Sequence, residues 1–508
     1  MNAILSNVKV KIEKTITMKR ITLIITLLSL FCTLHAQVTD FEEWKKQKQQ
    51  EFNQFTAAKQ KEFASFRDSL NAAYAEHMKK TWEQFHVREA VPVPEKPEPP
   101  KPVVKPVDEK PALTAALPVK EVVKPEIPAT PDPPKPVQPI ARPEKEEAAS
   151  FTFQFHHTPC HIHLQKSQSF SMPNASETSA AAAWKKMSDS GYDLVADDCL
   201  RYKEQLALND WGYIALTKAL SGAFLGEGTN EATLMQIYLL AQSGYKIRIA
   251  RGNGKLIPLI PFTGNIYGYS YLTLKGERYY LICDDKEGGS YSVFNEKFDG
   301  ERTASLVLQA EPKLAEDKTA PRTFTSQRYP AVSATVSTNK NLIEFYNNYP
   351  VTEFWNEYAK ASLSRDIKKH LYPPLKKEIA GKTPVEAANI LLNFVQTAFN
   401  YKTDGEQFGY ERPLFGDEMF YYPYSDCEDR SILFTILVHD LLHLDIVMLE
   451  YPNHLATAVR FPKEVQGFYV MMNGDKYVFC DPTYIGASVG DCMPQFRNTS
   501  EVSVVVYE

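Results

Sequence analysis

The chain has few cysteines for its length and no excess of basic residues, and each shortage excludes a class of protein. Seven cysteines in 508 residues are too few for a fold held together by disulfides. The formal net charge is −5 at pH 7, and no basic stripe is interleaved with aromatics, so we expect no nucleic-acid partner. The one long apolar run, near the N-terminus, is too short to span a membrane comfortably, so we expect no transmembrane segment.

That N-terminal run predicts an export signal. From Met18, the stretch MKRITLIITLLSLFCTLHAQ has a basic start, about 14 apolar residues and Ala36 at a typical cleavage position. We therefore expect residues 1–36 to be a signal peptide whose true start is Met18. The mature chain would be exported, either to the periplasm or to the cell surface and the extracellular space.

Aromatic residues then recur every 11 residues, from Phe41 to Phe85. Eleven residues make three helical turns, so the aromatics lie along one stripe of a nearly straight helix or a right-handed coiled coil. We expect a helix over residues 37–90 that forms homo-oligomers or binds a partner helix through residues 41–85. Packing of the stripe onto the chain's own domains is the alternative.

Proline dominates the next segment. Residues 91–143 hold 17 of the 34 prolines, mixed with Lys, Glu and Val. Such a composition favours extended polyproline conformation and cannot build a core of its own. We interpret residues 91–148 as a spacer.

From residue 149 the composition is globular, and two regions follow the same order. GEGTNEATLMQIYLLAQSGYKIRIA with GYSYLTLKGERYYLICDD, and YSDCEDRSILFTILVHDLLHLDIVML with GFYVMMNGDKYVFCDPTY, each predict a helix, a strand and a hairpin ending in Cys-Asp. We expect two copies of one domain, at residues 149–335 and 336–508. Asn230 in the first copy occupies the place that Cys427 has in the second.

Cys427 falls where the second of these helices begins. Ser425 and Glu428 have the spacing of a capping box, which places Cys427 in the first turn. There the backbone N–H groups and the helix dipole stabilise a thiolate and lower the thiol pKa below the ~8.5 of a free cysteine. The neighbouring carboxylates Asp426, Glu428 and Asp429 act in the opposite direction.

Two further residues complete a possible nucleophilic site. His454 begins the alternating stretch HLATAVRF, and Asp481 follows a hairpin that turns at Asn473-Gly474. A nucleophilic thiol needs a base within hydrogen-bond reach, and that imidazole needs an acceptor that fixes its tautomer. Cys427, His454 and Asp481 meet both needs in this order.

In SDCEDRS, NHLATAV and CDPTY the sequence resembles the transglutaminase-like superfamily, and its bacterial, exported, protease-like branch above all. The resemblance is best over residues 385–486. It implies an α+β fold with a papain-like core, in which a cysteine-bearing helix packs on an antiparallel sheet. It also implies that Cys427 is the nucleophile, His454 the general base and acid, and Asp481 the residue that orients the histidine.

The expected activity is hydrolysis of amide bonds in a protein or peptide through a Cys427 thioester. Acyl transfer that crosslinks proteins is one alternative, and a catalytically inactive module that binds a protein or a glycan is another. The backbone N–H of Cys427 would be one oxyanion donor, and Gln407 or Tyr424 the second.

No cofactor is expected. Asp426 and Glu428 are candidate calcium ligands, although capping and electrostatics explain both residues without an ion. His439 and His443 lie on the Cys427 helix and are interpreted as surface or packing residues.

Overall fold

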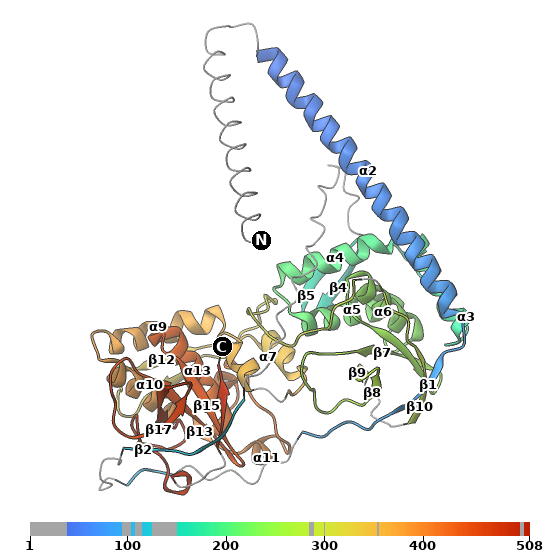
Figure 1. The fold of residues 1–508 in the computed structure, drawn as a ribbon. Helices are drawn as coiled ribbons and strands as arrows, with labels where there is room; N and C mark the ends of the chain where they lie inside the picture. Colours follow the sequence, from blue (N-terminus) through green and yellow to red (C-terminus); the bar gives the residue numbers. More distant parts are fainter. Residues whose placement is uncertain are drawn as a thin grey trace, which may run out of the picture. The chain divides into compact units, whose positions relative to one another are not determined.

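The computed structural model describes residues 38–93, 103–106, 114–123, 150–283, 289–298, 300–352, 355–497 and 502–507. The chain forms two compact units, Met1–Leu70 with Gln138–Arg142 and Asn71–Val137 with Pro143–Glu508. The fold is mixed α+β with antiparallel sheets, as the sequence predicts (Figure 1). Within the described ranges, no helix is long and apolar enough to cross a membrane. The predicted signal peptide, residues 1–36, lies outside the described residues.

The long N-terminal helix is present but shorter than predicted. Helix α2 spans Val38–Met78 instead of reaching residue 90. The Trp82 side chain donates its Nε1–H to the Met78 carbonyl at 2.9 Å and so satisfies a carbonyl of the last turn. After it, EQFHV alternates with the period of a strand and forms β1 (Glu83–Val87). Phe85 therefore belongs to a strand and not to an aromatic stripe on a helix.

The last part of α2 uses one of its repeat aromatics in the core. Tyr74 is buried, with its ring 4.7 Å from that of Trp184 and 5.0 Å from that of Phe294. Phe66 is 59% exposed. Packing onto the chain's own domain thus accounts for Tyr74, and association through residues 41–85 stays a prediction.

The N-terminal module surrounds a six-stranded antiparallel sheet in the order β1-β10-β6-β7-β9-β8. Its helices are α3 (Glu177–Asp189), α4 (Tyr192–Gln205), α5 (Asp210–Leu225) and α6 (Asn230–Gln242), with a 3-10 turn at Lys166–Gln168. Its strands are β4 (Phe151–Phe155), β5 (Thr158–Ile162), β6 (Arg248–Gly252), β7 (Lys255–Ile260), β8 (Tyr271–Leu274), β9 (Glu277–Leu281) and β10 (Gly289–Phe294). Strands β4 and β5 form a separate hairpin.

The C-terminal module begins earlier than residue 336. The hairpin β11 (Arg322–Thr325) and β12 (Ser333–Val336) belongs to it, because Ser326 in the turn donates to the Asn393 side chain at 2.8 Å. Its helices are α7 (Lys340–Asn347), α8 (Trp355–Lys360), α9 (Arg365–Ile379), α10 (Pro384–Ala398), α11 (Asp404–Gln407), α12 (Glu418–Tyr421) and α13 (Cys427–Leu442), with a 3-10 turn at Pro494–Phe496.

The strands of this module form a seven-membered sheet in the order β2-β17-β18-β16-β15-β19-β3. They are β2 (Ala115–Ala116), β3 (Val119–Val123), β15 (Ile446–Tyr451), β16 (His454–Arg460), β17 (Phe468–Met472), β18 (Asp475–Cys480) and β19 (Val502–Val506), and a short parallel pair joins β13 (Asn400–Tyr401) to β14 (Tyr424–Ser425). The five strands after α13 lie in the order fifth, first, second, fourth, third. The five strands after α6 lie in this same order.

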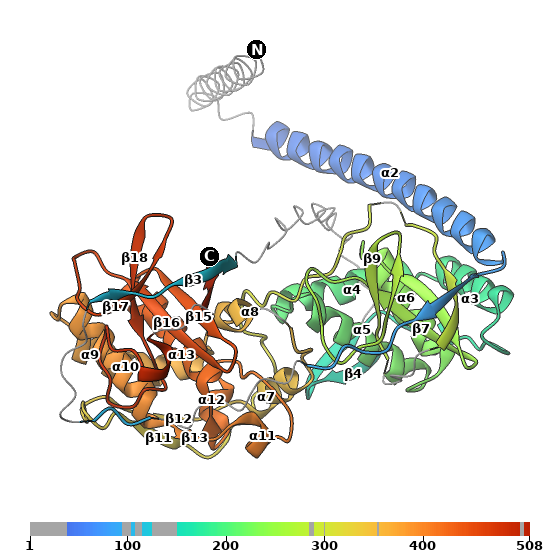
Figure 2. The same cartoon turned by 60° about the horizontal axis from the view of Figure 1, so that its bottom comes forward.

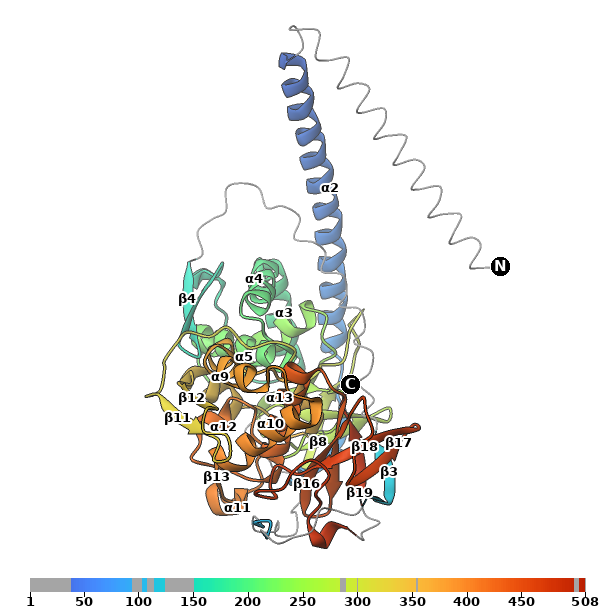
Figure 3. The ribbon, with the colours of Figure 1, turned by 90° about the vertical axis from the view of Figure 1, so that its left-hand side faces the viewer.

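The proline-rich segment is more than a spacer. β2 pairs with β17 and β3 pairs with β19, both in parallel, so residues 115–123 cover both edges of the C-terminal sheet. Figures 2 and 3 show β3 beside this sheet. The stretch VKEVV can form a strand despite the surrounding prolines, and an unpaired sheet edge exposes backbone groups that need partners. The Leu117 side chain, between β2 and β3, is buried in an apolar cluster with side chains of this sheet.

Strand β1 has a similar place in the N-terminal module. It pairs with β10, and Arg88 directly after it exchanges backbone hydrogen bonds of 2.7 and 3.1 Å with Tyr271 at the start of β8. Both edges of this sheet are therefore covered by the segment that follows α2. Residues 83–123 supply a closing strand to each module.

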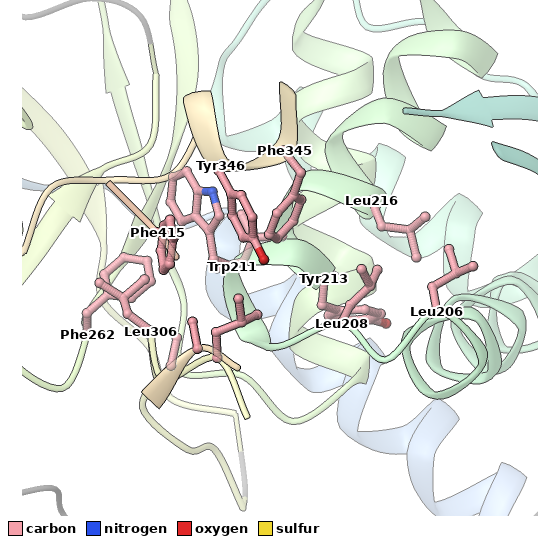
Figure 4. Packing of buried hydrophobic residues seen from close by; sticks show 14 of the residues in the cluster. Leu206, Leu208, Trp211, Tyr213, Leu216, Phe262, Leu306, Phe345, Tyr346 and Phe415 are labelled. Atoms are coloured by element: carbon pink, nitrogen blue, oxygen red, sulfur yellow. The ribbon is translucent and has the colours of Figure 1, made fainter. Parts of the chain in front are cut away.

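One apolar core continues from one module into the other. Trp211 of α5, Phe345 and Tyr346 of α7, and Phe415 before α12 gather within it (Figure 4). Tyr346 stacks on Phe415 with ring centroids 4.5 Å apart, and Trp211 Nε1 donates to the Asn348 carbonyl at 3.1 Å. The two modules therefore pack against each other through a shared apolar core.

If residues 115–123 complete the C-terminal sheet, Leu117→Ala should destabilise that module by about 2 to 5 kcal/mol, the usual result of emptying a buried leucine site. Urea denaturation monitored at C-terminal peptides by hydrogen exchange measures this change. Val122→Ala, at a 42% exposed position of β3, is the matched control. Equal midpoints for the two variants would contradict the role of Leu117.

Candidate functional site

Cys427 lies in the first turn of helix α13, as predicted, but the helix begins one residue later than the predicted capping box implies. The N-cap is Asp426, whose backbone is extended, and not Ser425. The Asp426 N–H donates to the Asp429 carboxylate at 3.1 Å. Ser425 lies in β14, where its backbone pairs with Tyr401. Cys427 is thus the first residue of the helix, where N–H groups without helical partners favour an anion.

The Cys427 side chain is 1% exposed, and its Sγ–H donates to Glu428 Oε2 at 2.8 Å. In this arrangement the thiol is hydrogen-bonded to a carboxyl group and not to the predicted base.

His454 and Asp481 form the pair that the sequence predicts. His454 is the first residue of β16, and Asp481 directly follows β18, the neighbouring strand. Nε2 of His454 lies 3.0 Å from Asp481 Oδ2, and neither side chain is exposed. Because an ionised carboxylate can only accept, this contact places the imidazole proton on Nε2. Nδ1 is buried, has no hydrogen-bond partner, and is left as a proton acceptor.

Two aromatic rings pack beside the imidazole. The Phe496 ring stacks on that of His454 with centroids 4.9 Å apart and planes 7° apart. Tyr451, at the end of β15, lies 6.3 Å from His454 at 29°, and its ring packs 4.5 Å from that of Phe496. The ring of Phe496 therefore limits the tilt of the imidazole toward that side.

A direct hydrogen bond joins the cysteine helix to the histidine strand. Ser431, one turn after Cys427, donates its hydroxyl to the backbone carbonyl of Leu455 at 2.8 Å. Leu455 is next to His454, so the start of α13 and the start of β16 are held near each other. The structure thus pairs two of the three predicted residues directly and brings the third to the same region.

Four buried carboxyl groups surround the start of α13: Asp404, Asp426, Glu428 and Asp429. Burial and the charge of neighbouring carboxylates raise the pKa of Asp404 to about 9 and that of Asp429 to about 7. The same causes raise the pKa of Asp426 well above its usual range. At neutral pH Asp404 is therefore protonated, and the cluster carries less negative charge than its composition suggests.

Arg430 does not neutralise the cluster through hydrogen bonds. Its guanidinium donates to the carbonyls of Gln396 and Phe399, at 3.3 and 2.8 Å. Candidate metal-ligand atoms of Asp426, Cys427 and Glu428 lie within 4.8 Å of one another, and Asp426 Oδ1 has no hydrogen-bond partner. The two carboxylates of this set suit a hard cation whereas the Cys427 sulfur does not, and calcium at Asp426 and Glu428 stays a prediction.

The second oxyanion donor is also a prediction still. Gln407 ends α11, and its Nε2 donates to the Tyr424 carbonyl at 3.4 Å, while its Oε1 has no partner. The amide donor is therefore engaged with Tyr424, the other candidate position. His439 and His443 are exposed at the far end of α13, in agreement with their interpretation as surface residues.

Sequence reasoning missed Gln396, a buried residue of α10. Its Nε2 donates to the carbonyls of Asp481 and Tyr484, at 3.0 and 2.8 Å, and its Oε1 accepts from the Gly486 N–H at 3.2 Å. One amide thus holds the loop that carries Asp481. The signal was a polar residue in the otherwise apolar stretch NILLNFVQTAF.

Asn230 holds the corresponding position in the N-terminal module. It is the first residue of α6, and its side chain donates to the Gly254 carbonyl at 3.0 Å and accepts from the Leu256 N–H at 2.8 Å. Where Cys427 presents a thiol, Asn230 ties its helix to the hairpin of β6 and β7. The position serves packing and offers no nucleophile.

The buried carboxyl groups predict stability that falls as pH rises. Their folded-state pKa values lie above the unfolded ones, so the native state binds more protons and loses stability between about pH 4 and 9. Asp404→Asn should remove part of this loss. Between pH 5 and 9 the wild type should lose at least about 1.4 kcal/mol more than the variant, the equivalent of one pKa unit.

Urea denaturation of both proteins at pH 5, 7 and 9 measures the difference. Asp475→Asn, at an exposed position of β18, is the control and should follow the wild type. Parallel losses in the wild type and Asp404→Asn would show that Asp404 does not titrate in this range.

The chain matches no protein-family model, no curated protein and no solved structure. A functional assignment therefore has to come from the site itself, in which a cysteine begins a helix and a buried histidine–aspartate pair lies on the adjoining sheet.

Proposed function

We propose that this chain is an exported cysteine hydrolase of the transglutaminase-like type, which cleaves amide bonds in proteins or peptides through a Cys427 thioester. The observation that carries the proposal is the His454–Asp481 pair. It fixes the imidazole tautomer and leaves a buried Nδ1 without a partner. Burying an imidazole nitrogen without a hydrogen-bond partner costs folding free energy. A catalytic role explains why the protein keeps such a nitrogen, because it can accept the proton of the Cys427 thiol.

The reaction follows from these positions. His454 Nδ1 takes the Cys427 proton, and the sulfur attacks the carbonyl carbon of the substrate amide. The tetrahedral oxyanion collapses, the C–N bond breaks, and the departing amine takes the proton from His454. Water, deprotonated by the same imidazole, then attacks the thioester and releases a carboxylic acid and the thiol. Asp481 stabilises the imidazolium formed in each half of the cycle.

The four carboxyl groups near Cys427 oppose a thiolate less than four full negative charges would. Protonation of Asp404 at neutral pH removes one charge from the group, and the raised pKa of Asp426 acts in the same direction. The helix N-terminus then faces weaker opposition in stabilising a thiolate.

We further propose that the N-terminal module is a second transglutaminase-like copy without chemistry. Two observations support this: the strands after α6 and α13 share one order, and Asn230 replaces the cysteine at the start of α6. Such a copy would bind or orient the substrate.

A binding protein without catalytic activity is the second candidate. The 1% exposure of Cys427 and its hydrogen bond to Glu428 favour this alternative, because both keep the thiol in place and protonated. The two candidates differ in whether the thiol reacts.

Alkylation by iodoacetamide between pH 5 and 9, read for each cysteine by peptide mass, separates them. For a catalytic thiol we expect Cys427 to react below pH 7 about tenfold faster than an ordinary thiol, and His454→Ala to abolish that advantage. Cys480 and Cys492, which are equally buried and whose pKa values burial raises, are internal controls that should stay unreactive. An ordinary thiol profile for Cys427 in both proteins would favour the binding protein.

A further inference from the structure

We propose that residues 103–105 of the proline-rich segment position the Asp481 carboxylate on His454. The inference rests on the proposed function of Cys427, His454 and Asp481. It adds a positioning element from a distant part of the chain, since Lys105 precedes its partner Asp491 by 386 residues.

Residues 103–105 contact the loop that follows Asp481. Lys105 donates its backbone N–H to the Ile485 carbonyl at 2.9 Å, and Ile485 donates its own to the Val103 carbonyl at 3.0 Å. The Lys105 ammonium lies 2.6 Å from Asp491 Oδ2, and the two side chains are only 18% and 10% exposed. Residues 103–105 thus bind the loop at its middle and at its end.

Hydrogen bonds within this loop, residues 481–491, orient the Asp481 carboxylate. Asp481 Oδ1 accepts from the N–H groups of Thr483 and Tyr484, at 2.8 and 3.2 Å. Ile485 follows immediately, so a shift of Ile485 moves the donors that orient the carboxylate. At the other end, Asp491 Oδ2 accepts from the Ser488 N–H at 2.8 Å. The Lys105 ammonium therefore binds the same oxygen that closes the loop.

Other elements hold the loop at positions after Ile485. Gln396 and Asn389, both on α10, accept from the N–H groups of Gly486 and Val489 at 3.2 and 2.8 Å. Arg328 donates to the Gly486 carbonyl at 2.7 Å, and the Gly490 backbone is bonded to the neighbouring strands β17 and β18. Residues 103–105 contribute the backbone hydrogen bonds of Ile485, the residue that directly follows the donors to Asp481.

The continuation of the segment, at Leu117, packs in the apolar cluster beside the histidine. Leu117 lies in the same buried cluster as Tyr451 and Phe496, the two rings beside His454. The segment therefore supports both members of the pair: residues 103–105 through the Asp481 loop, and Leu117 through the apolar cluster behind the imidazole.

The test is Lys105→Met in the full chain, which keeps the length and apolar stem of the side chain and removes its charge. Amide hydrogen exchange over residues 481–491 should accelerate about fivefold or more, with exchange elsewhere in the C-terminal sheet unchanged. The fast alkylation of Cys427 below pH 7 should slow by about tenfold, because a poorly oriented Asp481 stabilises the imidazolium less. Lys105→Arg should restore both.

Two further variants sharpen the result. Lys120→Met makes the same substitution at a 62% exposed position of the same segment and should change neither measurement. Asp491→Asn should reproduce the effect of Lys105→Met, and the double variant should be no worse than either, as expected for two residues acting as a pair. If Lys105→Met fails to fold, Asp491→Asn alone tests the inference.

Loop exchange within twofold of the wild type in Lys105→Met and Asp491→Asn would overturn the inference. So would faster loop exchange with an unchanged alkylation profile in a protein whose wild type reacts below pH 7. A wild type with an ordinary thiol profile would instead overturn the proposed function, and loop exchange would still decide whether residues 103–105 hold the Asp481 loop.

Discussion

The architecture depends on strand pairing between residues 83–123 and two sheets that lie far along the chain. β1 joins β10 and reaches β8 through Arg88, whereas β2 and β3 join β17 and β19. Open sheet edges are liabilities because their backbone groups can pair with other chains. Here the strands β1, β2 and β3, which follow one another in the chain, cover the edges of both sheets. Leu117 packs in the apolar cluster of the C-terminal sheet. The rest of the site is built on that closed sheet.

Within the C-terminal module, two opposed effects set the charge of the carboxyl groups at the start of α13. The helix N-terminus attracts negative charge, and the sequence places three acidic residues beside Cys427. Burial of these carboxyl groups, with Asp404 added from α11, makes full ionisation unfavourable and raises their pKa values. The cluster therefore retains protons at neutral pH, which limits the repulsion that a thiolate at Cys427 would meet.

The sequence predicted those parts of the structure that depend on local patterns. Periodicity located α2 and α13, alternation located β16, and the Asn473-Gly474 turn located the β17–β18 hairpin. Cys427, His454 and Asp481 were predicted as a site from their order in the chain and from the chemistry of the three residue types. The histidine–aspartate contact at 3.0 Å is as predicted, whereas the thiol bonds to Glu428.

Long-range contacts could not be read from the same patterns. Proline content suggested a spacer, because composition does not reveal that VKEVV finds a partner strand at residues 502–506. The end of α2 was misplaced because Phe85 fits both an 11-residue repeat and a strand. Gln396 and Lys105 act through loop carbonyls and one carboxylate distant in sequence, and nothing local marks such partners.

The pairing of β3 with β19 also constrains the order in which the protein can fold. Glu121 accepts a hydrogen bond from Ser503, a residue 382 positions later, so the strand that closes the C-terminal sheet is made long before its neighbours. Contacts of such sequence separation form slowly, since a large loop must close first. During synthesis, residues 115–123 must wait until β17 and β19 have left the ribosome. The histidine–aspartate pair is therefore assembled late, because His454 and Asp481 both belong to strands and loops of this sheet.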